Sequence, residues 1–258
     1  MINFEKWHGN GNDFVIINSI EESIKLKKSF IKKIADRNMG VGFDQLIHIG
    51  LPTKDNHDFF VRFYNADGSE AGMCLNGIRC ASSYIWKKSL APMREINFRT
   101  KHINIKCFPK GDKQVSALLS KPKDMRNALL EKKLKKIIDN EIFLSSIGNN
   151  HLGIKMQSVD KVDLNMLYKK IEKLIKSLDI NLSIFTKKDK FVQIRTFENG
   201  VGETLSCGSA ALCVASHFIK DKAIKIKSFG GQLRFENHQD GILMSGPTNF
   251  IYKGNIDE

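Results

Sequence analysis

Two stretches of this chain repeat one another. Residues 65–83 read NADGSEAGMCLNGIRCASS, and residues 198–216 read ENGVGETLSCGSAALCVAS. When Cys74 is aligned with Cys207, at an offset of 133, Cys80 falls on Cys213. A second landmark recurs at a similar offset of 137, because residues 11–13 (GND) and 148–150 (GNN) each precede an apolar, strand-like run. Two landmarks in the same order predict two α/β halves of one ancestral fold.

The segments around each repeat predict the same local structure twice. Residues 59–64 and 191–197 are rich in aromatic and β-branched residues and indicate strands. Each leads into a Gly-containing turn and then into a helix, expected over about 74–88 and 207–220. Further helices are expected over 121–140 and 161–178. The expected elements also include a hairpin of 103–108 with 114–119. Four more strands are expected, at 223–228, 232–236, 243–245 and 250–252.

Length and composition exclude several classes of protein. The chain has 258 residues, 41% of them hydrophobic, with few prolines and glycines, so it can bury the core of one large domain or two smaller ones. No apolar run approaches the roughly 18 residues that a membrane span needs, and the first residues lack the apolar core of a signal peptide. Five cysteines fit a disulfide framework poorly. We therefore expect a reduced, cytoplasmic protein with no membrane partner.

The net charge of +13 raises the possibility of nucleic-acid binding. Much of the lysine excess lies in residues 121–136 and 161–176. In the second stretch apolar residues recur at helical spacing, so the lysines fall on the solvated face of an amphipathic helix. No zinc-finger spacing or RNA-binding aromatic signature accompanies them. We expect no nucleic-acid partner, although a basic nucleic-acid-binding protein with structural cysteines stays open as an alternative and predicts salt-dependent binding.

The two aligned cysteines stand where chemistry is expected. Cys74 and Cys207 each follow a polar turn at the start of a helix, where unpaired N–H groups and the helix dipole favour a thiolate. Pseudo-symmetry would set the two thiols on opposite sides of one substrate. One thiolate could then remove a proton from carbon while the other thiol delivers one to the opposite face, which inverts a stereocentre. The alternative is a pair of buried or disulfide-linked cysteines. Cys80 and Cys213, six residues further on, are expected to fill the core.

With these motifs in place, the sequence resembles the diaminopimelate epimerase family. The resemblance runs in the family's order from residue 8 to residue 209 and extends to the chain's end. It is carried by residues 8–14 (HGNGNDF), 36–45 (DRNMGVGFDQ), 65–70 (NADGSE), 74–80 (CLNGIRC), 148–151 (GNNH) and 198–209 (ENGVGETLSCGS), with the ending 247–252.

The resemblance implies a cofactor-independent, metal-free isomerase that interconverts LL- and meso-diaminopimelate in lysine and peptidoglycan precursor synthesis. It also implies a homodimer of a chain with two pseudo-symmetric α/β lobes, each a sheet wrapped around a central helix. The expected lobes are residues 1–115, joined by the returning segment 248–258, and residues 116–247. The resemblance assigns proton transfer to Cys74 and Cys207, assisted by His151 and Glu198. The positions expected to contact the amino-acid substrate are Asn12, Gln45, Asn65, Leu75, Asn76, Asn149, Asn181, Asn199, Gly208 and Ser209.

Three positions depart from the family's pattern. Leu75 stands where the family has Gly after the first cysteine, and Asn150 stands where it usually has Pro. Asn199 replaces an Arg that the resemblance assigns to the distal carboxylate of diaminopimelate. A bidentate Arg–carboxylate pair is a strong specificity device, whereas Asn offers neutral hydrogen bonds only. A related two-cysteine racemase that acts on another amino acid is therefore an alternative. An isomerase of similar fold without catalytic cysteines is a more distant one.

Overall fold

The computed structural model describes residues 1–21, 23–111, 113–219 and 223–257. The chain divides into two compact units. Unit 1 comprises residues 1–119 with 245–258, and unit 2 comprises residues 120–244. The break lies at Leu119 rather than near residue 116, because the last strand of a hairpin runs from Gln114 to Leu119 without interruption. The returning segment begins at Ser245, inside a strand, rather than at residue 248.

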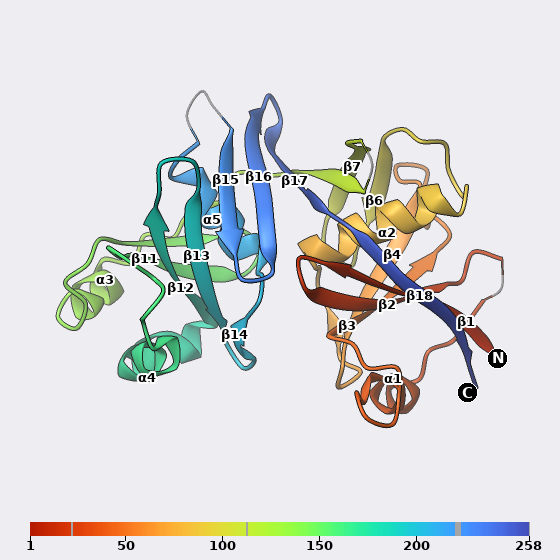
Figure 1. Cartoon of the computed structure of the whole chain (residues 1–258), viewed down its shortest axis with the longest axis horizontal. Coiled ribbons are helices and arrows are strands. Elements are labelled where there is room, and N and C mark those ends of the chain that lie inside the picture. Colours follow the sequence, from red (N-terminus) through yellow and green to blue (C-terminus); the bar gives the residue numbers. More distant parts are fainter. Residues whose placement is uncertain (22, 112, 220–222, 258) are drawn as a thin grey trace. The chain divides into compact units, whose positions relative to one another are not determined.

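Unit 1 is a mixed sheet with one long helix (Figure 1). Its helices are α1 (Lys28–Ala35) and α2 (Leu75–Lys87). Its strands are β1 (Ile2–Gly9), β2 (Asn12–Asn18), β3 (Gln45–Gly50), β4 (Phe59–Asn65), β5 (Glu70–Ala71), β6 (Ile96–Arg99), β7 (Asn104–Pro109), β8 (Gln114–Leu119) and β18 (Asn249–Ile256).

The sheet of unit 1 surrounds α2. The helix packs against β1, β2, β3, β7 and β8, and all its residues except Ser83 and Lys87 are buried or nearly so. Val15, Ile17, Leu46 and α1 residues such as Ile31 form a second apolar cluster on the other side of β2 and β3. Because both faces of these strands are covered, their sequences are continuous apolar runs rather than alternating ones.

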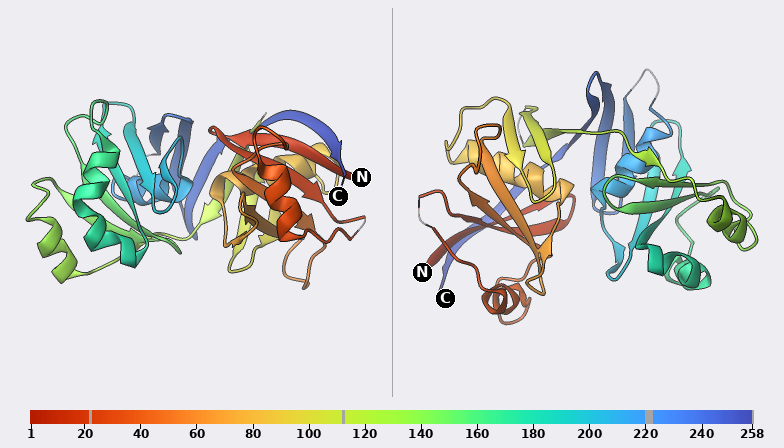
Figure 2. Two further views of the ribbon diagram at one scale, coloured as in Figure 1. Left: turned by 90° about the horizontal axis from the view of Figure 1, so that it is seen from below. Right: turned by 180° about the vertical axis from the view of Figure 1, so that it is seen from behind.

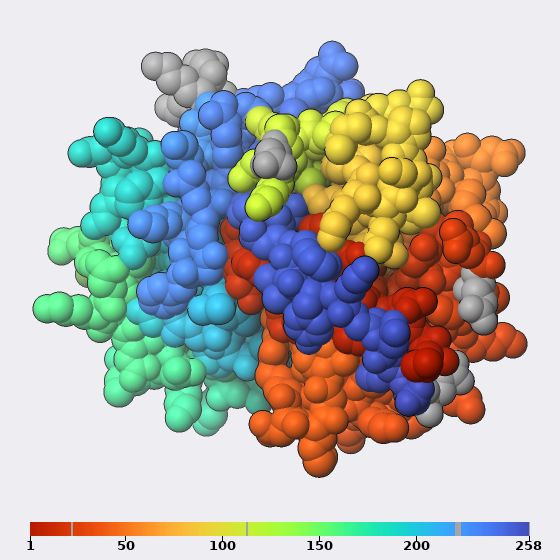
Figure 3. Space-filling model, turned by 45° about the vertical axis from the view of Figure 1, so that its right-hand side comes forward, coloured from red at the N-terminus to blue at the C-terminus, as the bar shows by residue number. Residues whose placement is uncertain are grey.

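The last strand closes unit 1. β18 pairs antiparallel with β1, from Ile2 opposite Ile256 to His8 opposite Asn249. Figure 2 shows the two strands side by side with both termini at the same end. In Figure 3, β18 (dark blue) lies open at the surface beside the red N-terminal residues. Phe250, Ile251 and Tyr252 of this strand are exposed. β18 therefore belongs to unit 1, where it is the neighbour of β1.

Unit 2 repeats this plan. Its strands are β9 (Lys123–Asp124), β10 (Ile142–Ser146), β11 (Asn150–Lys155), β12 (Ile180–Lys187), β13 (Val192–Glu198), β14 (Gly202–Thr204), β15 (Ile224–Ser228), β16 (Gly231–His238) and β17 (Gly241–Pro247), the last of which leads into unit 1. Its helices are α3 (Ala128–Leu134), α4 (Leu164–Ile175) with a 3-10 turn at Lys176–Leu178, and α5 (Gly208–Ser216).

The strand pairings of the two units match one for one. β1–β2 is antiparallel, β2–β3 parallel, β3–β4 antiparallel and β4–β6 parallel in unit 1. In the same order, β10–β11 is antiparallel, β11–β12 parallel, β12–β13 antiparallel and β13–β15 parallel in unit 2. This shared topology confirms the α/β fold of two repeated halves, with α5 the counterpart of α2.

Three predicted helices differ from the structure. In 121–140 only Ala128–Leu134 is α-helical, because Lys123 and Asp124 pair with β10 and the Asn127 side chain caps the helix by accepting from Leu130 N. In 161–178 the α-helix starts three residues late, after Asp163 accepts from Met166 N. α5 ends at Ser216, and Lys220, the predicted end, lies outside the described residues. Within those residues no helix is long and apolar enough to cross a membrane.

Candidate active site

Cys74 and Cys207 occupy equivalent positions. Each is the residue that immediately precedes its helix, with extended backbone angles of φ −132° and ψ 118° at Cys74 and φ −112° and ψ 112° at Cys207. The carbonyl of each accepts the first intrahelical bond, from Ile78 N at 2.9 Å and from Ala211 N at 3.0 Å. Both sulfurs therefore lie at the positive end of a helix dipole, which favours a thiolate.

In unit 1 two predicted asparagines surround Cys74. The Cys74 Sγ atom lies 3.4 Å from Asn12 Oδ1, and Asn76 Nδ2 lies 3.4 Å from the same oxygen. Asn12 begins β2, whereas Asn76 is the second residue of α2. The β1–β2 hairpin and the helix start thus bring together three predicted site residues that are far apart in the chain.

Asn76 is held by a buried cation. Arg79 is fully buried and donates to Asn76 Oδ1 at 2.9 Å and to the Leu75 carbonyl at 3.1 Å. Burial lowers the pKa of the Arg79 guanidinium, while negative charge on the nearby Cys80, Cys74 or Cys107 sulfur would act to raise it. Because its oxygen is engaged by Arg79, Asn76 turns its NH2 group toward Asn12.

Gln45 and Asn65 form a second predicted pair in unit 1. They are directly opposite in the β3–β4 register, and Gln45 Nε2 donates to Asn65 Oδ1 at 2.9 Å. Asn65 Nδ2 in turn donates to Ser69 Oγ at 3.1 Å. The other amide atom of Gln45, Oε1, is buried and has no hydrogen-bond partner in the described part of the chain.

In unit 2 the structure gathers Cys207 with two other predicted residues. Cys207 Sγ lies 3.3 Å from Ser209 Oγ, and Asn149 Nδ2 donates to that hydroxyl at 3.2 Å. Gly208 is the first residue of α5 and is buried. Ser209 therefore joins the helix start to the turn before β11, much as Asn12 joins β2 to the start of α2 in unit 1.

His151 is buried in unit 2, and neither ring nitrogen has a hydrogen-bond partner among the residues that the structure describes. It lies on β11 opposite Asn181 of β12. Burial lowers the pKa of the imidazole to about 4, so the ring is neutral near pH 7. A buried polar group that is left unsatisfied costs about 1–3 kcal/mol, which a bound polar ligand would recover.

Glu198 and Asn199 are held by hydrogen bonds within unit 2. Thr204 Oγ1 donates to Glu198 Oε1 at 2.7 Å across the β13–β14 pair. Asn199 Oδ1 accepts from Tyr168 Oη at 2.7 Å, and its Nδ2 donates to Asp179 Oδ1 at 2.7 Å. The Asn199 backbone N–H donates to Asn181 Oδ1 at 2.8 Å. Both amide atoms of Asn199 are thus already bonded within the unit.

Cys80, Cys213 and two of the positions that depart from the family's pattern, Leu75 and Asn150, have structural roles. Cys80 and Cys213 are buried, as expected for core residues, and burial raises the pKa of each thiol to about 12. Leu75 is 4% exposed, so its bulk lies away from solvent. Asn150 donates to the carbonyl of Leu178, which ties the start of β11 to the turn after α4. The functional assignments of the predicted site residues stay predictions.

Several polar residues at these sites were not predicted. Asp44 and Arg37 contact Asn12 or its neighbour Asp13, and Tyr168 and Asp179 contact Asn199. Asp44 stands next to the predicted site residue Gln45 in the 36–45 motif, so its position in the sequence could have indicated that it lies at the site. Tyr168 had none, because it reaches Asn199 from a helix 31 residues away in the chain.

Acid should destabilise the fold through the buried His151 and the half-buried His48. Burial lowers the pKa of His48 and of His151 to about 4, below the usual value of 6.5, so the unfolded chain binds more protons below pH 6.5. We expect the free energy of unfolding to fall as the pH drops from 6.5 to 4, by about 1–3 kcal/mol per histidine. Urea titrations across this range measure it. His151→Gln and His48→Gln should each make the free energy of unfolding depend less steeply on pH. A dependence as steep as that of the wild type in both variants would contradict the lowered pKa of these histidines.

Comparison with known proteins identifies the family to which the chain belongs. The family model described as diaminopimelate epimerase matches residues 4–122 and 143–251. The chain belongs to the diaminopimelate epimerase family. Its members are isomerases, and so is this protein. A diaminopimelate epimerase of Acinetobacter baumannii (strain AYE) is 31% identical over 100% of this chain and 98% of its own length. One of Buchnera aphidicola subsp. Acyrthosiphon pisum is 31% identical over 99% and 96%.

Solved structures share the fold at lower identity. A phenazine biosynthesis protein of the PhzF family from Bacillus anthracis has a TM-score of 0.74 at 15% identity and covers 100% of this chain and 99% of its own. A hydroxyproline epimerase from Agrobacterium vitis has a TM-score of 0.67 at 9% identity and covers 98% and 91%. These likenesses establish the fold and leave the substrate open.

Proposed function

We propose that the protein is a cofactor-independent diaminopimelate epimerase of lysine and peptidoglycan precursor synthesis, with Cys74 and Cys207 as its acid and base. The carrying observation is that these two thiols alone among the five cysteines precede helices at equivalent positions of the repeat. Cys207 is also buried, at 9% exposure, whereas Cys80, Cys107 and Cys213 are 0% exposed, and burial raises the pKa of each of these three to about 12.

The proposed reaction needs no redox step. One cysteine thiolate takes the proton from the substrate's α-carbon and becomes a thiol. The electron pair left on carbon is delocalised into the adjacent carboxylate, and the second cysteine's S–H then gives its proton to the opposite face of that carbon. The second cysteine is left as the thiolate, so the reverse reaction can start at once.

The carboxylate that carries this charge needs hydrogen-bond donors. Backbone N–H groups at the first turns of α2 and α5, around Asn76 and Ser209, are suited to an anion. The unpartnered nitrogens of buried His151 and the carboxylate of Glu198 are suited to the substrate's carboxylate and amine. Gln45, Asn65 and Asn149 supply further neutral hydrogen bonds in this proposal.

Exchange of the substrate's α-proton tests the proposal directly. The full chain, without added cofactor, is incubated with LL-diaminopimelate in D2O, and we expect both meso product and deuterium at the inverted carbon. An enzyme that leaves diaminopimelate unlabelled and uninverted would refute it. The homodimer, the cytoplasmic location and the amino-acid partner belong to the same proposal and are supported by the family assignment alone.

A second candidate is a racemase for an amino acid without a distal carboxylate. It is favoured by Asn199, which stands where the family resemblance implies Arg and whose amide is occupied by Tyr168 and Asp179. No guanidinium is therefore supplied at this position, and Asp179 places a carboxylate there instead.

A comparison of LL-diaminopimelate with L-lysine separates the two candidates, because lysine is diaminopimelate without one carboxylate. For the epimerase we expect kcat/KM to favour diaminopimelate by about 100-fold or more, since a site that hydrogen-bonds a group rejects the analogue that lacks it. Initial rates of α-proton exchange measure both substrates in the same assay. Equal rates, or faster exchange of lysine, would decide for the second candidate.

A further inference from the structure

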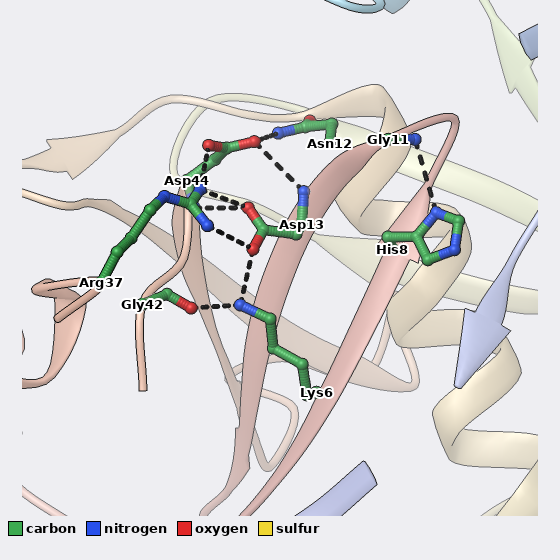
Figure 4. Close-up of polar contacts among 8 residues, drawn as sticks. All are labelled: Lys6, His8, Gly11, Asn12, Asp13, Arg37, Gly42 and Asp44. Atoms are coloured by element: carbon green, nitrogen blue, oxygen red, sulfur yellow. Dashed lines mark hydrogen bonds and ion pairs between the residues drawn. The ribbon is translucent and has the colours of Figure 1, made fainter. Parts of the chain in front are cut away.

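The Asn12 carboxamide has a defined orientation in unit 1. Asn12 Nδ2 donates to Asp44 Oδ2 at 2.8 Å (Figure 4). A carboxylate can only accept, so the NH2 group of Asn12 must face Asp44 and its oxygen must face away. That oxygen is the one that lies 3.4 Å from Cys74 Sγ and 3.4 Å from Asn76 Nδ2. Asp44, with its shorter bond, and Asn76 Nδ2 therefore both favour the orientation in which the Asn12 oxygen meets the Cys74 sulfur.

Asp44 is itself held at both oxygens. Its Oδ2 also accepts from the Asp13 backbone N–H at 3.2 Å, and its Oδ1 accepts from Arg37 Nη2 at 2.7 Å. Every group around the carboxylate is thus a donor. An asparagine at position 44 would have to turn its own NH2 group either toward Arg37 or toward Asn12, and in both cases a donor would meet a donor.

Asp13 holds both Arg37 and the backbone of Asp44 in place. Its carboxylate receives two bonds from Arg37, at 3.0 and 2.8 Å, one from Lys6 at 2.6 Å and one from the Asp44 backbone N–H at 2.9 Å. Lys6 also donates to the Gly42 carbonyl. Burial acts to raise the pKa of Asp13, but the hydrogen bonds and charges of Arg37 and Lys6 outweigh it and hold that pKa well below its usual range. Asp13 is therefore ionised and keeps Arg37 in place.

We propose that Asp44 is a positioning residue for Cys74, which it serves by fixing the Asn12 oxygen, rather than the Asn12 NH2 group, against the sulfur. An acceptor beside the sulfur stabilises the S–H form, whereas a donor would stabilise the thiolate. The catalytic meaning of this role rests on the proposed function, in which Cys74 must carry a proton in one direction and lose it in the other. The geometry itself is independent of that function.

Other groups in unit 1 act on the same sulfur. The buried Arg79 guanidinium and the α2 N-terminus both favour a Cys74 thiolate, while a Cys80 thiolate would oppose it. The oxygen of Asn12 works against Arg79. A reversible acid and base must be able to hold a proton in one direction and release it in the other, and these opposing influences act on the same sulfur.

The pH dependence of alkylation tests the role of Asp44. The full chain is treated with iodoacetamide between pH 5 and 10, and the labelling rates of Cys74 and Cys207 are read by peptide mass analysis. In Asp44→Asn, the side chain at position 44 no longer excludes the orientation in which Asn12 presents its NH2 group to the sulfur, so we expect the midpoint of the Cys74 labelling-rate profile to move to lower pH by about half a unit or more. Cys207, in unit 2, serves as the internal standard and should not move.

Two further variants show whether Asp44 acts through Asn12. Asn12→Ala removes the acceptor and should by itself lower the Cys74 midpoint, which keeps the test available if Asp44→Asn does not fold. In the double variant Asn12→Ala/Asp44→Asn we expect no additional shift. The matched control is Asp58→Asn, a carboxylate of the same unit that accepts a backbone N–H, from Asn97 at 2.7 Å, at the opposite end of β4 from Asn65.

Two results would overturn the proposal. In the first, the pH midpoint of Cys74 labelling is unchanged in both Asp44→Asn and Asn12→Ala. In the second, adding Asp44→Asn to Asn12→Ala shifts that midpoint as much as Asp44→Asn does alone. Alkylation requires no substrate, so the result is separate from the enzyme's activity. If the midpoint shifts but no amino acid is epimerised, the role of Asp44 stands and the proposed function fails. If diaminopimelate is epimerised but the midpoint does not move, only the role of Asp44 fails.

Discussion

Cys74→Ser and Cys207→Ser are each expected to lower kcat/KM for diaminopimelate epimerisation by about 10²–10⁴-fold. A serine hydroxyl is a far weaker acid than a thiol, so it neither holds the negative charge of the base nor returns a proton readily. The helix N-terminus that favours a thiolate at each position cannot compensate for this difference. Initial rates of meso product formation, with deuterium content at the α-carbon, measure the loss.

The two losses should not multiply. Because both cysteines serve one proton-transfer event, the double variant should be about as slow as the slower single variant. Cys80→Ala and Cys213→Ala are the matched controls, since these thiols lie on the same two helices and are buried. They should retain activity within a few-fold. Near-normal epimerisation by either serine variant would exclude the two-cysteine mechanism.

Gly77→Val is expected to destabilise the fold by about 3 kcal/mol, the upper end of what overpacking usually costs. A Cβ atom at Gly77 would already lie 2.7 Å from the Phe63 ring, 3.2 Å from Phe14 and 3.3 Å from Ile47. All three side chains are fully buried, so none can move into solvent. The sheet therefore approaches α2 too closely for any side chain at this position, although Gly costs helix stability elsewhere.

Thermal unfolding followed by circular dichroism measures this effect, and the melting temperature should drop by roughly 6–12 °C for a chain of this size. Gly50→Val is the control, because a Cβ at Gly50 would meet only the Phe60 carbonyl oxygen, at 3.9 Å, and β3 is a strand that accepts valine. Equal melting temperatures for the two variants would show that the α2–sheet contact is looser than described.

Local patterns in the sequence were sufficient for much of the fold. The repeat around Cys74 and Cys207 predicted the two halves, and the turn before each cysteine predicted the helix starts. The 103–108 and 114–119 hairpin is present as β7 and β8. The apolar spacing of residues 164–175 predicted α4, whose lysines are exposed and whose Ile171 and Ile175 are buried. These features depend on residues a few positions apart, so the period and the caps are visible in the chain itself.

The limits of α3 and the partners of the site residues depended on the tertiary structure. Residues 121–127 were predicted as part of a helix, but Lys123 and Asp124 pair with β10 at a sheet edge. Asn12 was recognisable as a site residue, but its orientation depends on Asp44, which is 32 residues away, and Asn199 is bonded by Tyr168 and Asp179. The sequence by itself determined where helices begin and which thiols stand at their ends. Only the folded chain decided which donor meets which acceptor, because a hydrogen bond depends on distances between strands that no local pattern records.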